Sequence, residues 1–164
     1  MGAACLVLAL VSPNFLTTDN VANVARRISA VTVVAVGEVL VILTGGIDLS
    51  VGSVAALSQV ATGHSIKAWG WPVVPGIALG ILVGLACGVV NGLLVTKGRI
   101  PPFIATLGMM LAARGGALGI SGGSRYSGFP GAFKWLGGGA QWWIPFLVMI
   151  GVVAVFAGQG VSQL

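Results

Sequence analysis

Charged residues are scarce in this chain of 164 residues, where Asp, Glu, Lys and Arg make up 7% and hydrophobic residues 57%. Soluble domains carry about 25% charged residues. Only three acids are present, Asp19, Glu38 and Asp48, and the mean hydropathy is +1.06. So few charges cannot cover the surface of a soluble domain. The composition therefore predicts an integral membrane protein.

Residues for catalysis and metal binding are equally few. The single histidine, His64, leaves no serine–histidine–acid set, and there is no G-x-x-x-x-G-K-[ST] phosphate loop, HExxH or CxxC motif. Cys5 and Cys87 lie in apolar runs without disulfide or metal-site spacing, which favours a structural role. We expect no enzyme activity, no metal and no cofactor. His64 is predicted to be a solvated residue at the membrane surface.

The eight basic residues give a net charge of +5 but are scattered singly or in one pair. No basic stripe with interleaved aromatic residues is present, so no nucleic-acid partner is expected. Membrane proteins keep Lys and Arg for loops and helix ends, which is where most of these residues lie. Their distribution does not fix the orientation of the chain in a membrane.

Long apolar runs dominate the rest of the chain. A transmembrane helix needs about 20 residues, and only two runs, Trp71–Val95 and Pro101–Gly119, reach that length. Shorter runs predict part-spanning helices. The fold class is thus all-α, a bundle of about five to six helices at Met1–Val11, Ile28–Leu43, Val51–Gly63, Trp71–Val95, Pro101–Gly119 and Ile144–Ala157.

Two connecting stretches have their own character. Residues 17–27 place Val21 and Val24 at helical spacing among polar residues, which predicts a short helix lying on the membrane surface. The glycine-rich stretch Gly122–Gln141 is predicted to be a long connection. Trp142 and Trp143 are then expected to anchor the last helix at the interface.

The sequence predicts a broken helix at Gly45–Ser50. Gly45 and Gly46 tolerate left-handed backbone angles and can end a helix, and the oxygens of Asp48 and Ser50 can cap the next one. A broken helix at membrane depth is tolerated only where it is buried in protein or lines a cavity. An acid placed there marks a transport pathway more often than ordinary packing. Asp48 is therefore a candidate for a transport route, with a plain helix cap as the alternative.

Glu38 lies in an apolar run ten residues before Asp48. An unpaired, ionised carboxylate there would cost at least about 2.5 kcal/mol. Glu38 is therefore predicted to be protonated, paired or exposed to an aqueous route, with Arg114 as the candidate counter-ion. A coupling residue and a structural salt bridge both remain open.

Five glycines recur at intervals of four in the Trp71–Val95 segment: Gly76, Gly80, Gly84, Gly88 and Gly92. Small residues at this spacing let another helix approach closely in a membrane. They predict a helix-packing face, which Gly84→Leu should disrupt. Asn91, at the end of the same segment, is predicted to bond across to a neighbour through its amide, with a ligand role as the alternative.

Three stretches resemble the permease subunit of ribose-type ABC importers: SPNFLTTDNVANVARR (Ser12–Arg27), LTGGIDLSVGS (Leu43–Ser53) and NGLLVTKGRIPPFIATLGMM (Asn91–Met110). The resemblance implies a multi-pass protein of the bacterial inner (plasma) membrane that works with a second permease subunit. ABC ATPase subunits drive such importers, and a periplasmic substrate-binding protein delivers a monosaccharide. The resemblance also implies that Arg26–Arg27 lie near the outside and Lys97–Arg99 inside.

Permeases of this family are about twice as long. Residues 1–164 are therefore expected to form a partial ABC permease domain that lacks the second half of the family domain. A non-transporting membrane fragment, which pairs with partner helices through its glycine face, is the alternative. An ion-coupled carrier that uses Asp48 and Glu38 as proton sites is a third possibility.

Overall fold

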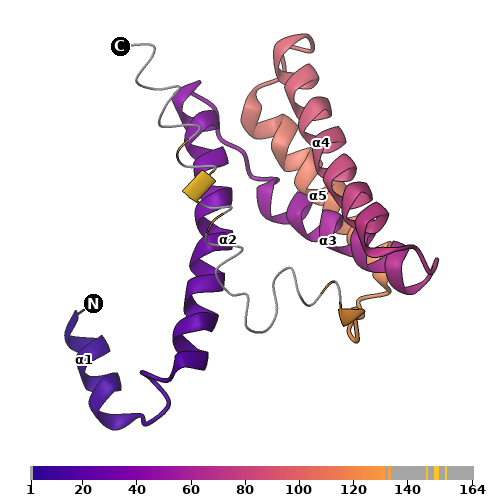
Figure 1. The fold of residues 1–164 in the computed structure, drawn as a ribbon. Helices are drawn as coiled ribbons and strands as arrows, with labels where there is room; N and C mark the ends of the chain where they lie inside the picture. Colours follow the sequence, from indigo (N-terminus) through magenta and orange to yellow (C-terminus); the bar gives the residue numbers. More distant parts are fainter. Residues whose placement is uncertain (1, 132, 134–146, 148–149, 152–153, 155–164) are drawn as a thin grey trace. The chain divides into compact units, whose positions relative to one another are not determined.

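The computed structural model describes residues 2–131, 133, 147, 150–151 and 154. The regular secondary structure of these residues is helical, with no β-strand among them, and includes five α-helices (Figure 1). The helices are α1 (Gly2–Val11), α2 (Thr18–Leu43), α3 (Val51–Lys67), α4 (Val73–Thr96) and α5 (Pro102–Ser121). Of the predicted helix Ile144–Ala157 only residues 147, 150–151 and 154 are described, and these four are helical. Its predicted anchors Trp142 and Trp143, the part of the connection that follows Phe133, and the Cys5 side chain lie outside the description.

The chain divides into two compact units, Met1–Val36 with Lys134–Leu164, and Gly37–Phe133. The division falls inside α2. The first unit contains α1 and the greater part of α2, and the second contains the last turns of α2 with α3, α4 and α5. The candidate functional residues all belong to the Gly37–Phe133 unit.

One continuous helix, α2, replaces the predicted surface helix at 17–27 and the separate segment Ile28–Leu43. The separate surface helix was therefore a wrong prediction. Thr17 begins α2, because its Oγ1 accepts a hydrogen bond from the Asn20 backbone N–H at 3.3 Å. No glycine or proline interrupts α2 before Gly37. The Ser29 hydroxyl donates to the Ala25 carbonyl at 2.7 Å, so this buried polar group is satisfied within the helix.

The predicted break follows the end of α2. Helical conformation stops at Leu43 and resumes at Val51. Gly45 has a φ of +75°, in the left-handed region that glycine adopts without strain. Gly46 is buried, and a Cβ atom added there would lie 3.2 Å from the Val41 side chain and 3.5 Å from Pro102 Cβ.

In the Gly37–Phe133 unit, α3 packs against both α4 and α5, which run beside it (Figure 1). The helix α3 continues to Lys67, four residues beyond its predicted end at Gly63. The apolar side chains buried inside this unit are mostly small. Among the described residues the buried apolar side chains are four alanines and one isoleucine: Ala61, Ile66, Ala105, Ala113 and Ala117.

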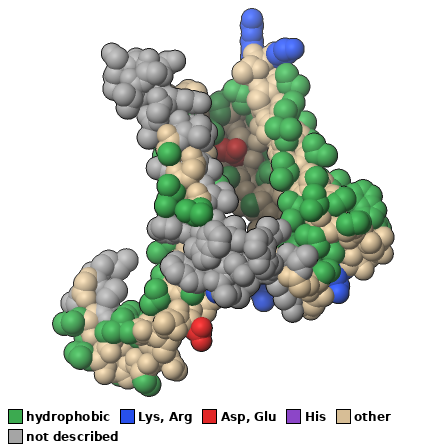
Figure 2. All heavy atoms as spheres, viewed as in Figure 1, with side chains coloured by type: hydrophobic (Ala, Val, Ile, Leu, Met, Phe, Trp, Pro, Cys, Tyr) green, Lys and Arg blue, Asp and Glu red, His purple; other side chains and the backbone are tan. Residues whose placement is uncertain are grey.

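Large apolar side chains lie on the outside of this unit instead. Leu82 and Leu85 of α4 are 59% and 61% exposed, and Leu111 of α5 is 62% exposed. Figure 2 shows hydrophobic side chains along the visible flank of the α3–α5 part, with Lys and Arg side chains near its ends. Two helices, α4 and α5, are long and apolar enough to cross a membrane. An inside of small residues and an outside of large ones is the reverse of a soluble domain.

Candidate functional site

Asp48 closes a tight turn within the helix break. Its Oδ1 accepts two hydrogen bonds from Ser50, one from the backbone N–H at 2.7 Å and one from the hydroxyl at 2.6 Å. Ser50 directly precedes α3, yet its side chain makes no capping bond to that helix. Asp48 and Ser50 therefore bond to each other, and the predicted capping of the free N–H groups of α3 is not observed.

Helix α4 reaches the break through Asn91. The Asn91 Nδ2 donates to Ser50 Oγ at 3.0 Å, which joins residues 41 positions apart. Both side chains are buried, with Ser50 1% and Asn91 8% exposed. The prediction that the Asn91 amide bonds across to a neighbour is confirmed, and the partner is Ser50 in the break.

Glu38 approaches the break from α2. Its Oε1 accepts a long hydrogen bond of 3.4 Å from the Asp48 backbone N–H. Its other oxygen, Oε2, is buried and has no hydrogen-bond partner. We call Glu38, Asp48, Ser50 and Asn91 the break cluster, since hydrogen bonds connect all four in sequence.

Arg114, the predicted counter-ion of Glu38, lies on α5 with an exposed side chain. No ion pair between the two occurs within the described part of the chain, so this prediction is wrong. The physical reason is the side of α5 on which Arg114 lies. Ala113 and Ala117 of that helix are the buried residues, and Arg114 is turned away from the core.

Helix α5 makes a second attachment to the break. The Thr106 hydroxyl shares its one hydrogen between the Pro102 carbonyl at 2.8 Å and the Ile47 carbonyl at 3.1 Å. Thr106 is only 4% exposed. Sequence reasoning missed this residue, although a hydroxyl within an apolar helix is a signal that it seeks a partner.

The predicted packing glycines of α4 divide into two groups. A Cβ atom at Gly76 would lie 2.5 Å from the Ile66 side chain, and one at Gly80 would meet Thr62 Oγ1 and, at 2.8 Å, the Ser58 carbonyl oxygen. At Gly84 it would lie 3.1 Å from Ser58 Oγ. Three glycines thus face α3 closely. At Gly88 and Gly92 a Cβ atom would meet nothing described within 4 Å.

His64 lies in a second polar group, at the far end of α3. Its Nδ1 is 2.8 Å from the Tyr126 hydroxyl, and its ring makes edge contacts with Trp69 and Tyr126. Lys67 Nζ donates to the Gly128 carbonyl at 3.0 Å. His64 is half-buried and has Tyr126 as a partner, while its predicted place at the membrane surface stays a prediction. Tyr126 follows 62 residues later and supplies a partner that local sequence does not reveal.

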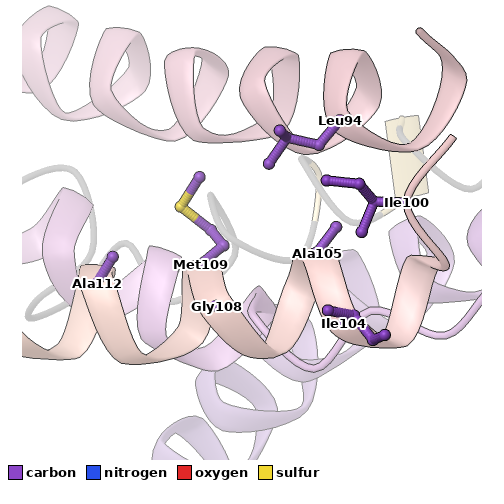
Figure 3. A pocket seen from close by; sticks show the side chains of 7 residues that line it. All are labelled: Leu94, Ile100, Ile104, Ala105, Gly108, Met109 and Ala112. Carbon is purple, nitrogen blue, oxygen red and sulfur yellow. The ribbon is translucent and has the colours of Figure 1, made fainter. Parts of the chain in front are cut away.

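An apolar groove of about 320 Å³ lies between α4 and α5. Figure 3 shows Leu94 of α4 directed toward α5, with Ile100 beside it and the side chains of Ala105 and Met109 on the facing helix. None of its seven lining residues carries a polar side chain: Leu94, Ile100, Ile104, Ala105, Gly108, Met109 and Ala112. The side chains of this groove therefore offer no hydrogen bond to a polar ligand. Among the described residues no group of three or more His, Cys, Asp or Glu side chains could hold a metal ion.

Comparison with known proteins places these features in a family. The family model described as "Branched-chain amino acid transport system / permease component" matches residues 20–158. The ribose import permease protein RbsC of Escherichia coli strain K12 is 40% identical over 156 residues, which cover 92% of this chain and 48% of that protein.

Two further relatives extend the similarity. RbsC of Bacillus subtilis strain 168 is 39% identical over 123 residues, 75% of this chain and 38% of its own length. The fructose import permease protein FrcC of Rhizobium meliloti is 38% identical over 110 residues, 63% of this chain and 31% of its own. The chain thus spans about half the length, or less, of these relatives. No solved structure matches it. The chain belongs to the permease component family, and within it to the ribose-type permeases of ABC importers.

Proposed function

We propose that this chain is part of the permease subunit of an ATP-driven importer of a monosaccharide or a similar small polar solute. The similarity to ribose import permease over 92% of the chain carries this proposal. Relatives named for fructose and D-allose support the substrate class. A periplasmic binding protein would deliver the solute, a second permease subunit would complete the route, and ATPase subunits would hydrolyse ATP.

The proposal places the chain in the bacterial inner membrane as a multi-pass protein. Two features support this: the length and apolar character of α4 and α5, and the exposure of large apolar side chains such as Leu82 and Leu111. In lipid no hydrophobic force drives helices together, so close van der Waals packing must do so. Gly76, Gly80 and Gly84 allow that packing against α3.

Within this function we assign the break Gly45–Ser50 and Glu38 to the solute route. The break cluster groups polar side chains in a unit whose other buried contacts are mainly small and apolar. Non-helical backbone at membrane depth is expected where it lines a route or is enclosed by protein. The apolar groove between α4 and α5 has no such groups and is not assigned to the route.

A second candidate function is a membrane fragment that does not transport and only pairs with partner helices. One observation favours it, which is the open part of the glycine face of α4. Gly88 and Gly92, which face no described atom within 4 Å, would then meet the partner helix.

A chimera separates the two candidates. This chain replaces the matching part of RbsC in E. coli cells that lack their own RbsC but keep the ribose ATPase and binding protein. The permease proposal predicts ribose uptake that is lost on ATP depletion and survives a protonophore. The reverse pattern would indicate an ion-coupled carrier. Normal membrane insertion without uptake would favour the non-transporting fragment. Cells with intact RbsC and cells with none provide the reference levels.

Asp48→Asn in this chimera tests the route assignment. An asparagine Oδ1 can still accept both hydrogen bonds from Ser50, so the amount of protein in the membrane should not change. Loss of the negative charge should reduce ribose uptake severalfold. Uptake equal to that of the parent chimera would reduce Asp48 to a replaceable turn residue.

A further inference from the structure

The break cluster has more hydrogen-bond acceptors than donors. Its donors are engaged inside it: Asp48 N–H bonds to Glu38, both Ser50 donors bond to Asp48, and the Asn91 amide nitrogen bonds to Ser50. Two acceptors, Glu38 Oε2 and Asn91 Oδ1, are buried and have no partner. They belong to the two end members of this series of hydrogen bonds, one on α2 and one on α4.

These two atoms call for a physical explanation. A buried polar group without a hydrogen bond destabilises a protein, and the great majority of such groups have a partner. Both oxygen atoms are buried, so solvent at the surface of this chain does not reach them. No side chain in the described part of the chain donates to either oxygen. A ligand that brings its own N–H or O–H donors would satisfy both.

We propose that Asn91 Oδ1 and Glu38 Oε2 accept hydrogen bonds from the hydroxyl groups of a neutral polyhydroxy solute on the transport route. This inference rests on the proposed permease function. Asn91 then has two roles: its Nδ2 attaches α4 to the break, and its Oδ1 binds the solute. Ser50 and Asp48 then act as positioning residues, because their bonds fix the Asn91 amide and the Asp48 backbone that Glu38 contacts.

Cysteine labelling in the RbsC chimera tests this site. In a version without other cysteines, Asn91→Cys is treated with a small hydrophilic thiol reagent, with and without D-ribose. We expect ribose to slow labelling severalfold and L-leucine to have no effect. Lys97→Cys, directly after α4 and exposed, is the matched control whose labelling ribose should not change.

Transport kinetics provide a second measurement. Asn91→Ala should lower the maximal rate of ribose uptake about fivefold, the effect of losing one hydrogen bond to the moving solute. The half-saturating concentration should not change, because the binding protein captures the ribose. Asn91→Asp keeps an acceptor at the site and should retain more uptake than Asn91→Ala. A purely structural role would instead lower the amount of protein in the membrane.

The outcomes separate this inference from the permease proposal. Ribose protection without uptake would support the site and contradict the permease function. Uptake without protection, or equal protection by leucine, would overturn the hydroxyl site while the permease function stands. A chimera that shows neither protection nor uptake contradicts both.

Discussion

The two ends of α4 make different contacts although one glycine spacing runs through both. Toward its beginning, Gly76 and Gly80 bring the α4 backbone against the side chains and backbone of α3. Toward its end, Gly88 and Gly92 face no described atom within 4 Å, and the contact to the break is a single hydrogen bond from Asn91. Glycines spaced four apart therefore mark where another helix can approach α4. Whether one does depends on the surface that the other helix presents, as α3 does at Gly76 and Gly80.

Of the substitutions that test this difference, Gly80→Ala should change the free energy of unfolding the most. Alanine normally favours a helix over glycine by up to about 1 kcal/mol. At Gly80 the added methyl would meet Thr62 and the Ser58 carbonyl, so we expect about 1–3 kcal/mol of destabilisation instead. The free energy of unfolding in detergent micelles measures the change.

Gly88→Ala is the matched control, since its methyl would meet nothing described within 4 Å. It should leave the stability unchanged or raise it. Gly84→Leu should also destabilise the chain, because even a Cβ atom there lies 3.1 Å from Ser58 Oγ. Equal effects of Gly80→Ala and Gly88→Ala would mean that the close approach to α3 does not control stability.

Ser50→Ala tests the attachment of the C-terminal end of α4 to the break. The substitution removes the hydroxyl that donates to Asp48 and accepts from Asn91. The Asn91 amide would then be buried without a partner on either side, so about 1–3 kcal/mol of stability should be lost. Thermal unfolding in micelles measures this loss. Ser53→Ala, one turn later on α3, is a half-buried serine outside the break cluster and provides the control.

Arg114→Gln should have the smallest effect. Arg114 is exposed and makes no ion pair with Glu38, so its loss should change the free energy of unfolding by less than about 0.5 kcal/mol. The same unfolding assay applies. A loss as large as that of Ser50→Ala would reinstate Arg114 as a partner of the break cluster.

Local backbone chemistry made the break predictable. Adjacent glycines at 45 and 46 mark the end of α2, and Asp48 and Ser50 mark the start of the next helix. A different signal, the alternation of polar and apolar residues, led to the wrong prediction of a separate surface helix at residues 17–27. Nothing in that stretch ends a helix, and the chain continues as one element to Leu43.

Partners distant in sequence could not be predicted. The pairs Ser50–Asn91, Ile47–Thr106 and His64–Tyr126 are separated by 41, 59 and 62 residues. Each depends on which face of one helix meets which face of another. The same limit explains the wrong pairing of Glu38 with Arg114, since opposite charges in two apolar helices do not reveal whether both side chains point inward.

The attachments of the break also impose an order on biosynthesis. The ribosome delivers the break before it delivers Asn91 and Thr106, the residues that bond to Ser50 and to the Ile47 carbonyl. Chains emerge from the N-terminus first. Until α4 and α5 have been made, the Ser50 hydroxyl and the Ile47 carbonyl lack these two partners. The nascent chain must therefore hold this segment in water, in the insertion machinery or against another protein until the later helices arrive.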